Sequence, residues 1–293
     1  MRMVRVGAIQ PEYCFPSAAC NCLSEEYKAD VDMIVDQFIK KRLAVTLELL
    51  NRAGELGLDI VTTSEDICGT GPYIADVSER NLFDSLLEAT APLAERELAE
   101  IARHHGMAIV GCYNRRTGGR NYNVASIFNR QGDIVGEYRK THLPPDEMWQ
   151  ITPGDELSVF DLDFGRVGIC ICYDMVFPEA VREDALKGAE IIFHPTVGYG
   201  WYDSIGEATL RTRANDNGVH IVTAKNYVRN AAGKSSIIDF WGQVRADAGF
   251  TRNAVVTGEL DLDERKLQPE WFNPTQVSGI ADVQERMNRG RRP

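Results

Sequence analysis

The spacing of hydrophobic residues predicts an alternation of strands and helices. Short apolar runs, typical of strands buried on both faces, predict strands at 5–10, 58–63, 107–113, 167–172, 190–194 and 220–224. Apolar residues at helical spacing predict helices over 31–55 and 93–105. Pro178 suits the first position of a helix that reaches Lys187, and another helix is expected within 204–217.

Later runs complete a single α/β domain. The runs 122–129 and 134–139 flank a turn signal and predict a hairpin, and two more strands are expected at 235–240 and 255–260. Because the chain shows no repeat, linker or change in composition, we expect one domain over residues 1–262. Residues 263–293 are interpreted as an extension, either a tail or an oligomer contact. Residues 12–32, within the segment 12–42, are irregular, contain three cysteines and are expected to form a loop or insertion.

Composition and net charge limit the kinds of molecule that the protein is expected to bind. The 293 residues include 32 Lys and Arg against 43 Asp and Glu, so the net charge is −11. Nucleic acids and anionic membranes attract clustered positive charge, so neither is expected as a partner, and a small-molecule substrate is favoured. No transmembrane segment is expected either. The seven cysteines cannot all pair within the chain and nothing resembles a secretory signal, which predicts a cytoplasmic protein with free thiols.

Metal and phosphate motifs are absent from the sequence. The five histidines show no HExxH spacing, and the chain contains no CxxC pair. Cys14, Cys20 and Cys22 lack an evident fourth ligand, so reduced thiols are preferred to a zinc site there. Gly69-Thr70-Gly71 lacks the glycine and lysine of a nucleotide-binding loop. We therefore expect no metal and no cofactor.

Cys172 is the strongest candidate for chemistry. It stands where a buried strand gives way to a helix, so free backbone N–H groups are expected nearby to bind an oxyanion, and the helix N-terminus should make the thiol easier to ionise. The alternative is a small core residue, which is preferred for Cys170. Glu65 and Lys140 also follow apolar runs. A carboxylate could take the thiol proton and an ammonium could stabilise negative charge, although each alone is more often a solvated loop charge.

The segment 168–179, GICICYDMVFPE, resembles the nucleophile motif of the nitrilase, or carbon–nitrogen hydrolase, superfamily. The segment 138–143, YRKTHL, is similar to the lysine motif of that family, and Glu65 takes the place of its glutamate. Further matching landmarks occur in the right order at Tyr122-Asn123, 213–217 and 233–236. The resemblance covers roughly residues 4–262, which is nearly the whole chain.

The resemblance implies a four-layer α-β-β-α sandwich that assembles into homodimers or larger homo-oligomers. It implies that Cys172 is the nucleophile, Glu65 the general base and Lys140 the cation beside the oxyanion, with the backbone N–H of Tyr173 as a further oxyanion donor. Glu147 fits the family's second glutamate, seven residues before the glycine of a Pro-Gly-Asp turn, and would be a supporting acid. The alternative for Glu147 is an exposed loop charge.

Departures from the family pattern bear on the substrate. Ser64 replaces the usual proline before the glutamate, which leaves the rigidity of that loop open. Tyr173-Asp174 stands where nitrile hydrolysers tend to have Trp-Glu, which favours an amide substrate. Val176 stands where relatives that bind carboxylates often have arginine, which favours a neutral or apolar substrate tail. An N-carbamoyl or ω-amide substrate would need another cation, for which Arg211 and Lys225 are candidates.

The resemblance therefore predicts hydrolysis of a small linear amide through a cysteine thioester, with release of ammonia or an amine and a carboxylic acid. Thr196, Tyr199 and Trp201 are candidate substrate contacts, and ordinary packing is the equal alternative for them. N-carbamoyl hydrolysis, nitrile hydrolysis and acyl transfer by the same thioester remain open. A non-catalytic scaffold is disfavoured by the complete set of Glu65, Lys140 and Cys172, and a thiol redox protein by the lack of CxxC.

Overall fold

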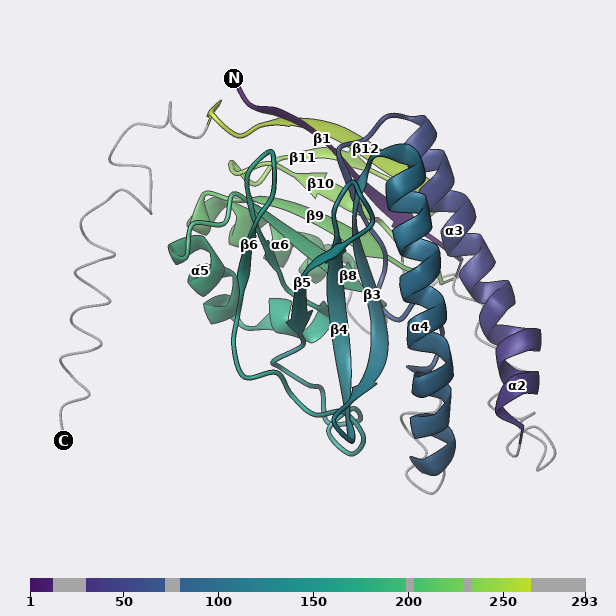
Figure 1. Ribbon diagram of the computed structural model, residues 1–293. Coiled ribbons are helices and arrows are strands. Elements are labelled where there is room, and N and C mark those ends of the chain that lie inside the picture. Colours follow the sequence, from purple (N-terminus) through teal and green to yellow (C-terminus); the bar gives the residue numbers. More distant parts are fainter. Residues whose placement is uncertain (13–29, 72–79, 199–202, 229–232, 265–293) are drawn as a thin grey trace, which may run out of the picture.

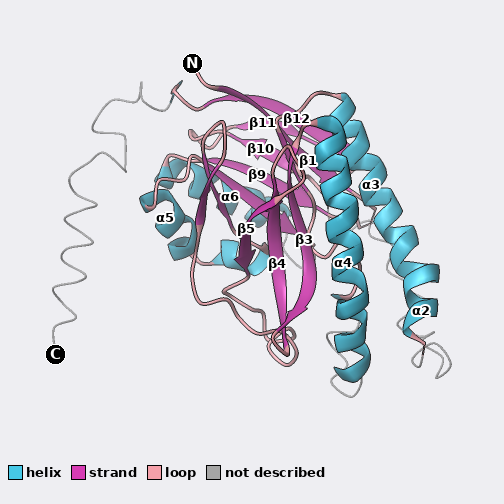
Figure 2. Ribbon diagram, in the orientation of Figure 1, coloured by secondary structure: helices cyan, strands magenta, loops and turns pink. Residues whose placement is uncertain are grey.

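The fold is a sandwich of two β-sheets with helices on both outer faces. The computed structural model describes residues 1–12, 30–71, 80–198, 203–228 and 233–264. Two six-stranded sheets face each other in the centre, and Figures 1 and 2 show helices on either side of them. This is the predicted α-β-β-α layering. Within the described part of the chain, no helix has both the length and the apolar character that a membrane span requires.

The first sheet has three parallel strands at its centre and antiparallel strands at its edges. Its spatial order is β12 (Ala254–Asp261), β1 (Met3–Gln10), β2 (Ile60–Thr62), β3 (Ala108–Thr117), β4 (Arg120–Phe128) and β5 (Ile134–Arg139). Strands β1, β2 and β3 are parallel. The long β3–β4 hairpin and β5 extend the sheet on one side, and β12 closes it on the other.

The second sheet repeats this plan. Its spatial order is β11 (Val244–Asp247), β10 (Ser236–Ile238), β9 (His220–Lys225), β8 (Ile191–Thr196), β7 (Arg166–Ile169) and β6 (Val159–Asp161). Strands β7, β8 and β9 are parallel, and the remaining strands pair antiparallel at the edges.

Helices cover the outer face of each sheet, as Figure 1 shows. The first sheet is covered by α2 (Val31–Ile34), which continues through a π-helical turn (Val35–Ile39) into α3 (Lys40–Glu55), and by α4 (Arg80–His105). The second sheet is covered by α5 (Pro178–Leu186) and α6 (Asp203–Asn217). A short 3₁₀ helix (Cys172–Val176) links β7 to α5.

Side chains from alternate strand positions divide between two cores. In β1, Val4 and Val6 belong to the core that includes the space between the sheets, whereas Ile9 packs under the helices. Strand β3 shows the same division between Val110 and Ile109. Both faces of the central strands are therefore buried, which explains why they appear in the sequence as continuous apolar runs.

The carboxyl ends of both sets of parallel strands meet at one end of the sandwich. Glu12, just beyond β1, forms a parallel bridge with Tyr227, just beyond β9. The Ser64 hydroxyl, beyond β2, donates to Oδ1 of Asn226 at 2.8 Å. Loops at the carboxyl ends of parallel strands are the usual location of ligand sites in α/β proteins.

The predicted strands and helices are confirmed, with changes at their bounds. Helix α4 begins at Arg80 rather than at Leu93, because burial of Phe83 and Leu86 extends the helix past Pro92, which lacks an N–H donor. Strand β7 ends at Ile169, three residues before Cys172. The short edge strands β6 and β11 were not predicted, since three or four residues carry little periodicity.

Candidate functional site

A buried lysine stands between two carboxylates at the carboxyl end of the sandwich. Lys140 follows β5 directly and its side chain is 0% exposed. Its Nζ donates to Oε1 of Glu65 at 2.9 Å, and to Oε1 and Oε2 of Glu147 at 2.8 and 2.9 Å. An isolated buried ammonium would be very unfavourable, so the two glutamates are the condition for its burial. Sequence reasoning selected all three residues, and the structure brings them together.

Glu65 is oriented by donors from three other segments. Besides Lys140, the Asn123 side-chain amide donates to its Oε1 at 2.8 Å, and the Val197 N–H donates to its Oε2 at 3.1 Å. The Cys172 side chain is also near enough to Glu65 to help lower the pKa of this carboxyl group. Ser64 stands in place of proline, and its hydroxyl bond to Asn226 ties this loop to the second sheet.

Cys172 begins the 3₁₀ helix in a conformation that is unusual for a non-glycine residue. Its φ of 45° lies in the left-handed region, which costs about 1–3 kcal/mol and persists only where the surroundings hold it in place. Tyr173 follows in the first turn of the helix, where backbone N–H groups have no partner within the helix. The turn therefore offers the thiol and a backbone donor side by side, as the sequence predicted.

The electrostatics of the cluster determine which of its groups are protonated. Burial alone would raise the pKa of Glu65, but the Lys140 charge and the donors around the carboxylate hold it below its usual value. Burial and the nearby Glu65 charge raise the pKa of Cys172. The resting pair is thus a carboxylate and a neutral thiol. The expectation that the helix N-terminus makes this thiol easier to ionise is wrong, because burial beside a carboxylate outweighs it.

Glu147 titrates differently from Glu65. Burial, opposed by the Lys140 charge and reinforced by the Glu65 charge, raises the pKa of Glu147 to about 7. Two carboxylates share one ammonium, so the second is ionised less readily than the first. The two glutamates are therefore suited to different protonation states near neutral pH.

Asp174 joins the Cys172 turn to the loop that follows Lys140. Its fully buried carboxylate accepts hydrogen bonds from the Tyr138 hydroxyl at 2.8 Å and the Ile171 N–H at 2.9 Å. It also accepts from the Thr141 hydroxyl at 3.0 Å, and from the N–H and Nδ1 of His142 at 2.8 and 2.9 Å. These bonds fix the Cys172 turn relative to the loop that follows Lys140.

The structure describes some of the candidate substrate contacts and not others. Thr196, at the end of β8, is buried, and its side chain is near enough to Cys172 to influence the pKa of the thiol. Tyr199 and Trp201 lie outside the described residues. Arg211 is half exposed on α6, where its Nε donates to the Gly242 carbonyl at 2.8 Å. Lys225 is buried at the end of β9, paired in register with Thr196.

The other described cysteines are buried in the cores. Burial raises the pKa of Cys68, Cys112 and Cys170, as expected for structural thiols. The possible zinc ligands at positions 14, 20 and 22 lie outside the described residues. Among the residues that the structure describes, there is no group of three or more His, Cys, Asp or Glu side chains placed to hold a metal ion.

Comparison with known proteins shows the family. A model of the family described as carbon-nitrogen hydrolase matches residues 36–269, which is most of the chain. The chain belongs to the carbon–nitrogen hydrolase family. Among its relatives, an omega-amidase from Homo sapiens is 31% identical over 235 residues, covering 73% of this chain and 80% of that protein. An omega-amidase from Xenopus laevis is 30% identical over 254 residues, covering 79% of this chain and 87% of that protein.

Solved structures of this family share the fold. An amidase from Nesterenkonia sp. AN1 in complex with butyramide has a TM-score of 0.70 at 22% identity, covering 90% of this chain and 94% of that chain. A carbon–nitrogen hydrolase from Helicobacter pylori G27 has a TM-score of 0.74 at 23% identity, covering 91% of each chain. The predicted family and its α-β-β-α fold are therefore confirmed, and the enzyme is an amidase-like carbon–nitrogen hydrolase.

Sequence reasoning missed several residues that hold the cluster. Asn123 was noticed as a family landmark without a role, although it orients Glu65. His194 is fully buried under the Cys172 turn, and Asn226 anchors the Glu65 loop. A histidine inside an apolar strand is a weak signal that could have suggested a buried polar network at position 194. Asn226 carries no such signal, because its partner is distant in sequence.

We predict that Asp174→Asn lowers the free energy of unfolding by about 3 kcal/mol. The amide replaces one acceptor oxygen with a donor, so buried donors from the neighbouring loop lose their partner. Urea denaturation measures the change, and Asp155→Asn at an exposed position is the matched control. Equal stability of the two variants would contradict the role assigned to the Asp174 network.

Proposed function

We propose that the protein hydrolyses a small linear amide through a thioester on Cys172. The observation that carries the proposal is the Glu65 carboxylate, which accepts a hydrogen bond from the Lys140 ammonium and lies near enough to the Cys172 side chain for each to shift the pKa of the other. A base, a nucleophile and a cation in contact are the groups that acyl transfer requires. The family and its amidase relatives support the same reaction class.

The first half of the reaction forms the thioester. Glu65 takes the thiol proton as the Cys172 sulfur attacks the amide carbon, because a thiol with a raised pKa needs a base at the moment of attack. The Tyr173 N–H and the Lys140 ammonium stabilise the oxyanion of the tetrahedral intermediate. Glu65 then gives the proton to the departing nitrogen, the C–N bond breaks, and ammonia or an amine leaves.

The second half releases the acid. Glu65, again a carboxylate, takes a proton from a water molecule whose oxygen attacks the thioester carbon, and Glu147 helps to position that water. The C–S bond breaks as the second tetrahedral intermediate collapses, and the sulfur recovers its proton from Glu65. The products are a carboxylic acid and the free thiol, so the enzyme returns to its starting state.

The sequence and the relatives favour an amide over a nitrile or an N-carbamoyl compound as the substrate. Tyr173-Asp174 after the nucleophile differs from the Trp-Glu of nitrile hydrolysers, and the relatives described above are amidases. Acyl transfer uses the same thioester, so hydroxylamine added to the assay would reveal it as a hydroxamate. Ammonia release from a panel of amides, nitriles and N-carbamoyl compounds ranks the candidates. The homo-oligomer and the cytoplasmic location stay predictions.

A second candidate is the ω-amide of a substrate that carries a carboxylate. The relatives from Homo sapiens and Xenopus laevis are omega-amidases. Lys225 pairs in register with Thr196, the residue beside the Cys172 thiol. Directly paired residues of adjacent strands lie on the same face of a sheet, about 5 Å apart. Lys225 is therefore within the span of a short substrate whose amide carbon lies at Cys172.

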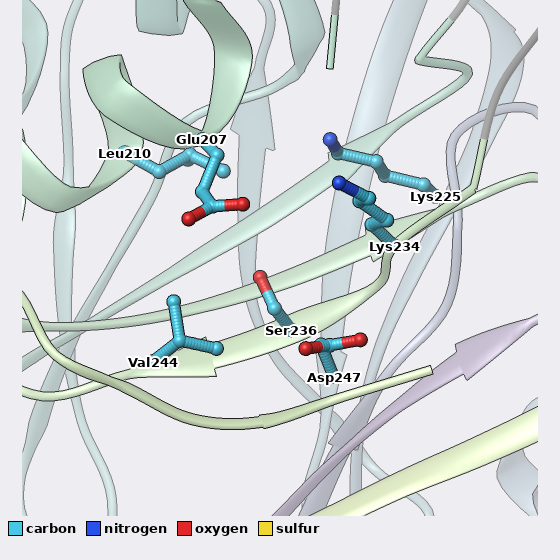
Figure 3. Close-up of a pocket in the computed structure, with 7 residues that line it drawn as sticks. All are labelled: Glu207, Leu210, Lys225, Lys234, Ser236, Val244 and Asp247. Atoms are coloured by element: carbon cyan, nitrogen blue, oxygen red, sulfur yellow. The ribbon is translucent and has the colours of Figure 1, made fainter. Parts of the chain in front are cut away.

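A polar cavity at Lys225 supports this candidate. Figure 3 shows the side chains of Lys225 and Lys234 on one side of the cavity and that of Glu207 across from them. Its volume of about 40 Å³ accommodates a carboxylate group. Asp247 also lines it, so the two lysines are balanced by two carboxylates, and a substrate carboxylate would compete with them for the ammonium groups. Arg211 has less support, because it lies half exposed on α6 and its guanidinium donates to the Gly242 carbonyl.

We predict that Cys172→Ala abolishes turnover of every amide that the wild type hydrolyses, while the protein stays folded. Removal of the nucleophile leaves no thioester route. Ammonia release and circular dichroism measure the two properties, and Cys170→Ala, which removes a buried thiol two residues away, should retain activity. Intact-mass spectrometry should detect an acyl adduct in the wild type only. Turnover by folded Cys172→Ala would refute the proposed mechanism.

We predict that kcat/KM of the wild type falls below about pH 7, because the pKa of Glu147 lies at about 7 and its proton is gained as the pH decreases. In Glu147→Gln the profile should be flat through pH 7, at a level about tenfold to a hundredfold below the wild-type plateau. In this variant kcat/KM should decrease only at the lower pH at which Glu65 becomes protonated. Glu156→Gln, at an exposed position, is the control. An unchanged inflection in Glu147→Gln would show that another group titrates.

We predict that Lys225→Met raises KM for ω-amides about tenfold or more, and leaves KM for neutral amides of the same length unchanged. Loss of one charge-assisted hydrogen bond to a carboxylate is worth about 1.5–3 kcal/mol. Steady-state kinetics on both substrate series measures the difference, and Arg211→Met is the control on the half-exposed face of α6. Equal effects on the two series would assign Lys225 a structural role only.

A further inference from the structure

His194 lies directly under the nucleophile turn. It belongs to β8, is fully buried, and its Nε2 is 3.3 Å from the carbonyl oxygen of Cys172. Its Nδ1 is 2.9 Å from the Thr223 hydroxyl on the neighbouring strand β9. The ring therefore links the second sheet to one particular peptide group, the one between Cys172 and Tyr173.

The hydrogen-bond partners determine the tautomer. A carbonyl oxygen can only accept, so the bond to Cys172 requires the proton on Nε2. In a neutral imidazole Nδ1 then accepts, and the Thr223 hydroxyl, which is 2.9 Å from Nδ1 and 3.2 Å from the His194 carbonyl oxygen, donates to the nearer Nδ1. Burial lowers the pKa of His194 to about 4, so the ring stays neutral near pH 7. The chain of donors runs from Thr223 through His194 to the Cys172 carbonyl.

We propose that His194 is a positioning residue that polarises the Cys172–Tyr173 peptide and strengthens its N–H as an oxyanion donor. The inference rests on the proposed function, in which the Tyr173 N–H binds the oxyanion. A donor on the carbonyl side of an amide withdraws electron density and makes the N–H on the other side more acidic, the cooperative effect of hydrogen bonds in series. The same bond holds Cys172 at its φ of 45°.

The resting bond length fits this role. At 3.3 Å the His194–Cys172 bond is longer than the usual N–H···O distance. Negative charge on the oxyanion draws the Tyr173 N–H dipole into alignment and increases the charge on the Cys172 oxygen, which shortens the bond to His194. A bond that is stronger in the transition state than in the resting enzyme raises kcat without changing KM.

Three variants separate polarisation from packing. His194→Met fills the space with no donor. His194→Gln keeps an N–H near the position of Nε2, and the Thr223 hydroxyl retains the backbone carbonyl of residue 194, 3.2 Å away, as an acceptor. Thr223→Val keeps the shape of the side chain and removes the donor to Nδ1. All three are assayed for kcat and KM on the best amide substrate.

A second measurement reports on how strongly the site stabilises an oxyanion. The aldehyde corresponding to the substrate forms a hemithioacetal, in which the Cys172 sulfur bonds to the aldehyde carbon, the carbonyl π bond becomes an oxyanion, and the thiol proton passes to Glu65. Its inhibition constant depends on the oxyanion donors. Alkylation of Cys172 by iodoacetamide breaks a C–I bond and creates no oxyanion, so its rate reports only access and thiol reactivity.

We expect kcat of His194→Met to fall about fivefold at unchanged KM. An oxyanion donor contributes about 10²–10³ in rate, and loss of the His194 bond should weaken the Tyr173 N–H donor by about 10–30%. The aldehyde inhibition constant should rise by the same factor, while the alkylation rate stays constant. His194→Gln should restore both values nearly to wild type, and Thr223→Val should lie between the two.

The outcomes are distinguishable. Wild-type kcat in His194→Met, an equal loss in His194→Gln, or a parallel loss of alkylation would overturn the inference and leave a packing role. Those results count against His194 alone as long as Cys172→Ala is inactive. If Cys172→Ala retains turnover, or if the aldehyde leaves no adduct on wild-type Cys172, the proposed function fails and the inference fails with it.

Discussion

The burial of one ammonium group organises the candidate site of this protein. Lys140 is fully buried and can be so only between two carboxylates. Glu65 comes from the loop after β2, and Glu147 from the loop that follows Lys140 itself. The pairing thus fixes two loops relative to β5. The Asn123 side chain and the Val197 N–H hold Glu65 in this cluster by donating to its two carboxylate oxygens.

The cluster also constrains how Cys172 can act as the proposed nucleophile. With two carboxylates and one ammonium, the ionised site has a net charge of −1 before the thiol is considered. A thiolate would add a second negative charge in a buried place, which is why burial and Glu65 raise the pKa of Cys172. In the proposed reaction, attack must then be coupled to proton transfer, and the neighbouring Glu65 carboxylate, whose pKa is held below its usual value, is suited to accept that proton.

The sequence predicted the elements and the reacting groups better than the network around them. Apolar runs locate the central strands because both faces are buried, whereas the three-residue strand β6 has too little pattern to detect. Glu65, Lys140 and Cys172 are recognisable because each follows a strand in a family motif. Asp174 belongs to the same motif, but its role depends on His142 and Tyr138, and only the folded chain shows that they converge. The direction of the Cys172 pKa shift likewise depends on burial, which the sequence does not contain.

The strain at Cys172 explains why so many buried polar groups surround a single turn. A left-handed backbone at a non-glycine residue persists only when its neighbours leave no relaxed alternative. Asp174 holds the turn from one side by accepting from the Ile171 N–H, and His194 holds it from the other at the Cys172 carbonyl. Each anchor reaches a different part of the fold, the lysine loop and the second sheet. Relaxation of the turn would therefore break buried hydrogen bonds in two places, at about 1–3 kcal/mol for each unsatisfied group, which exceeds the strain it would release.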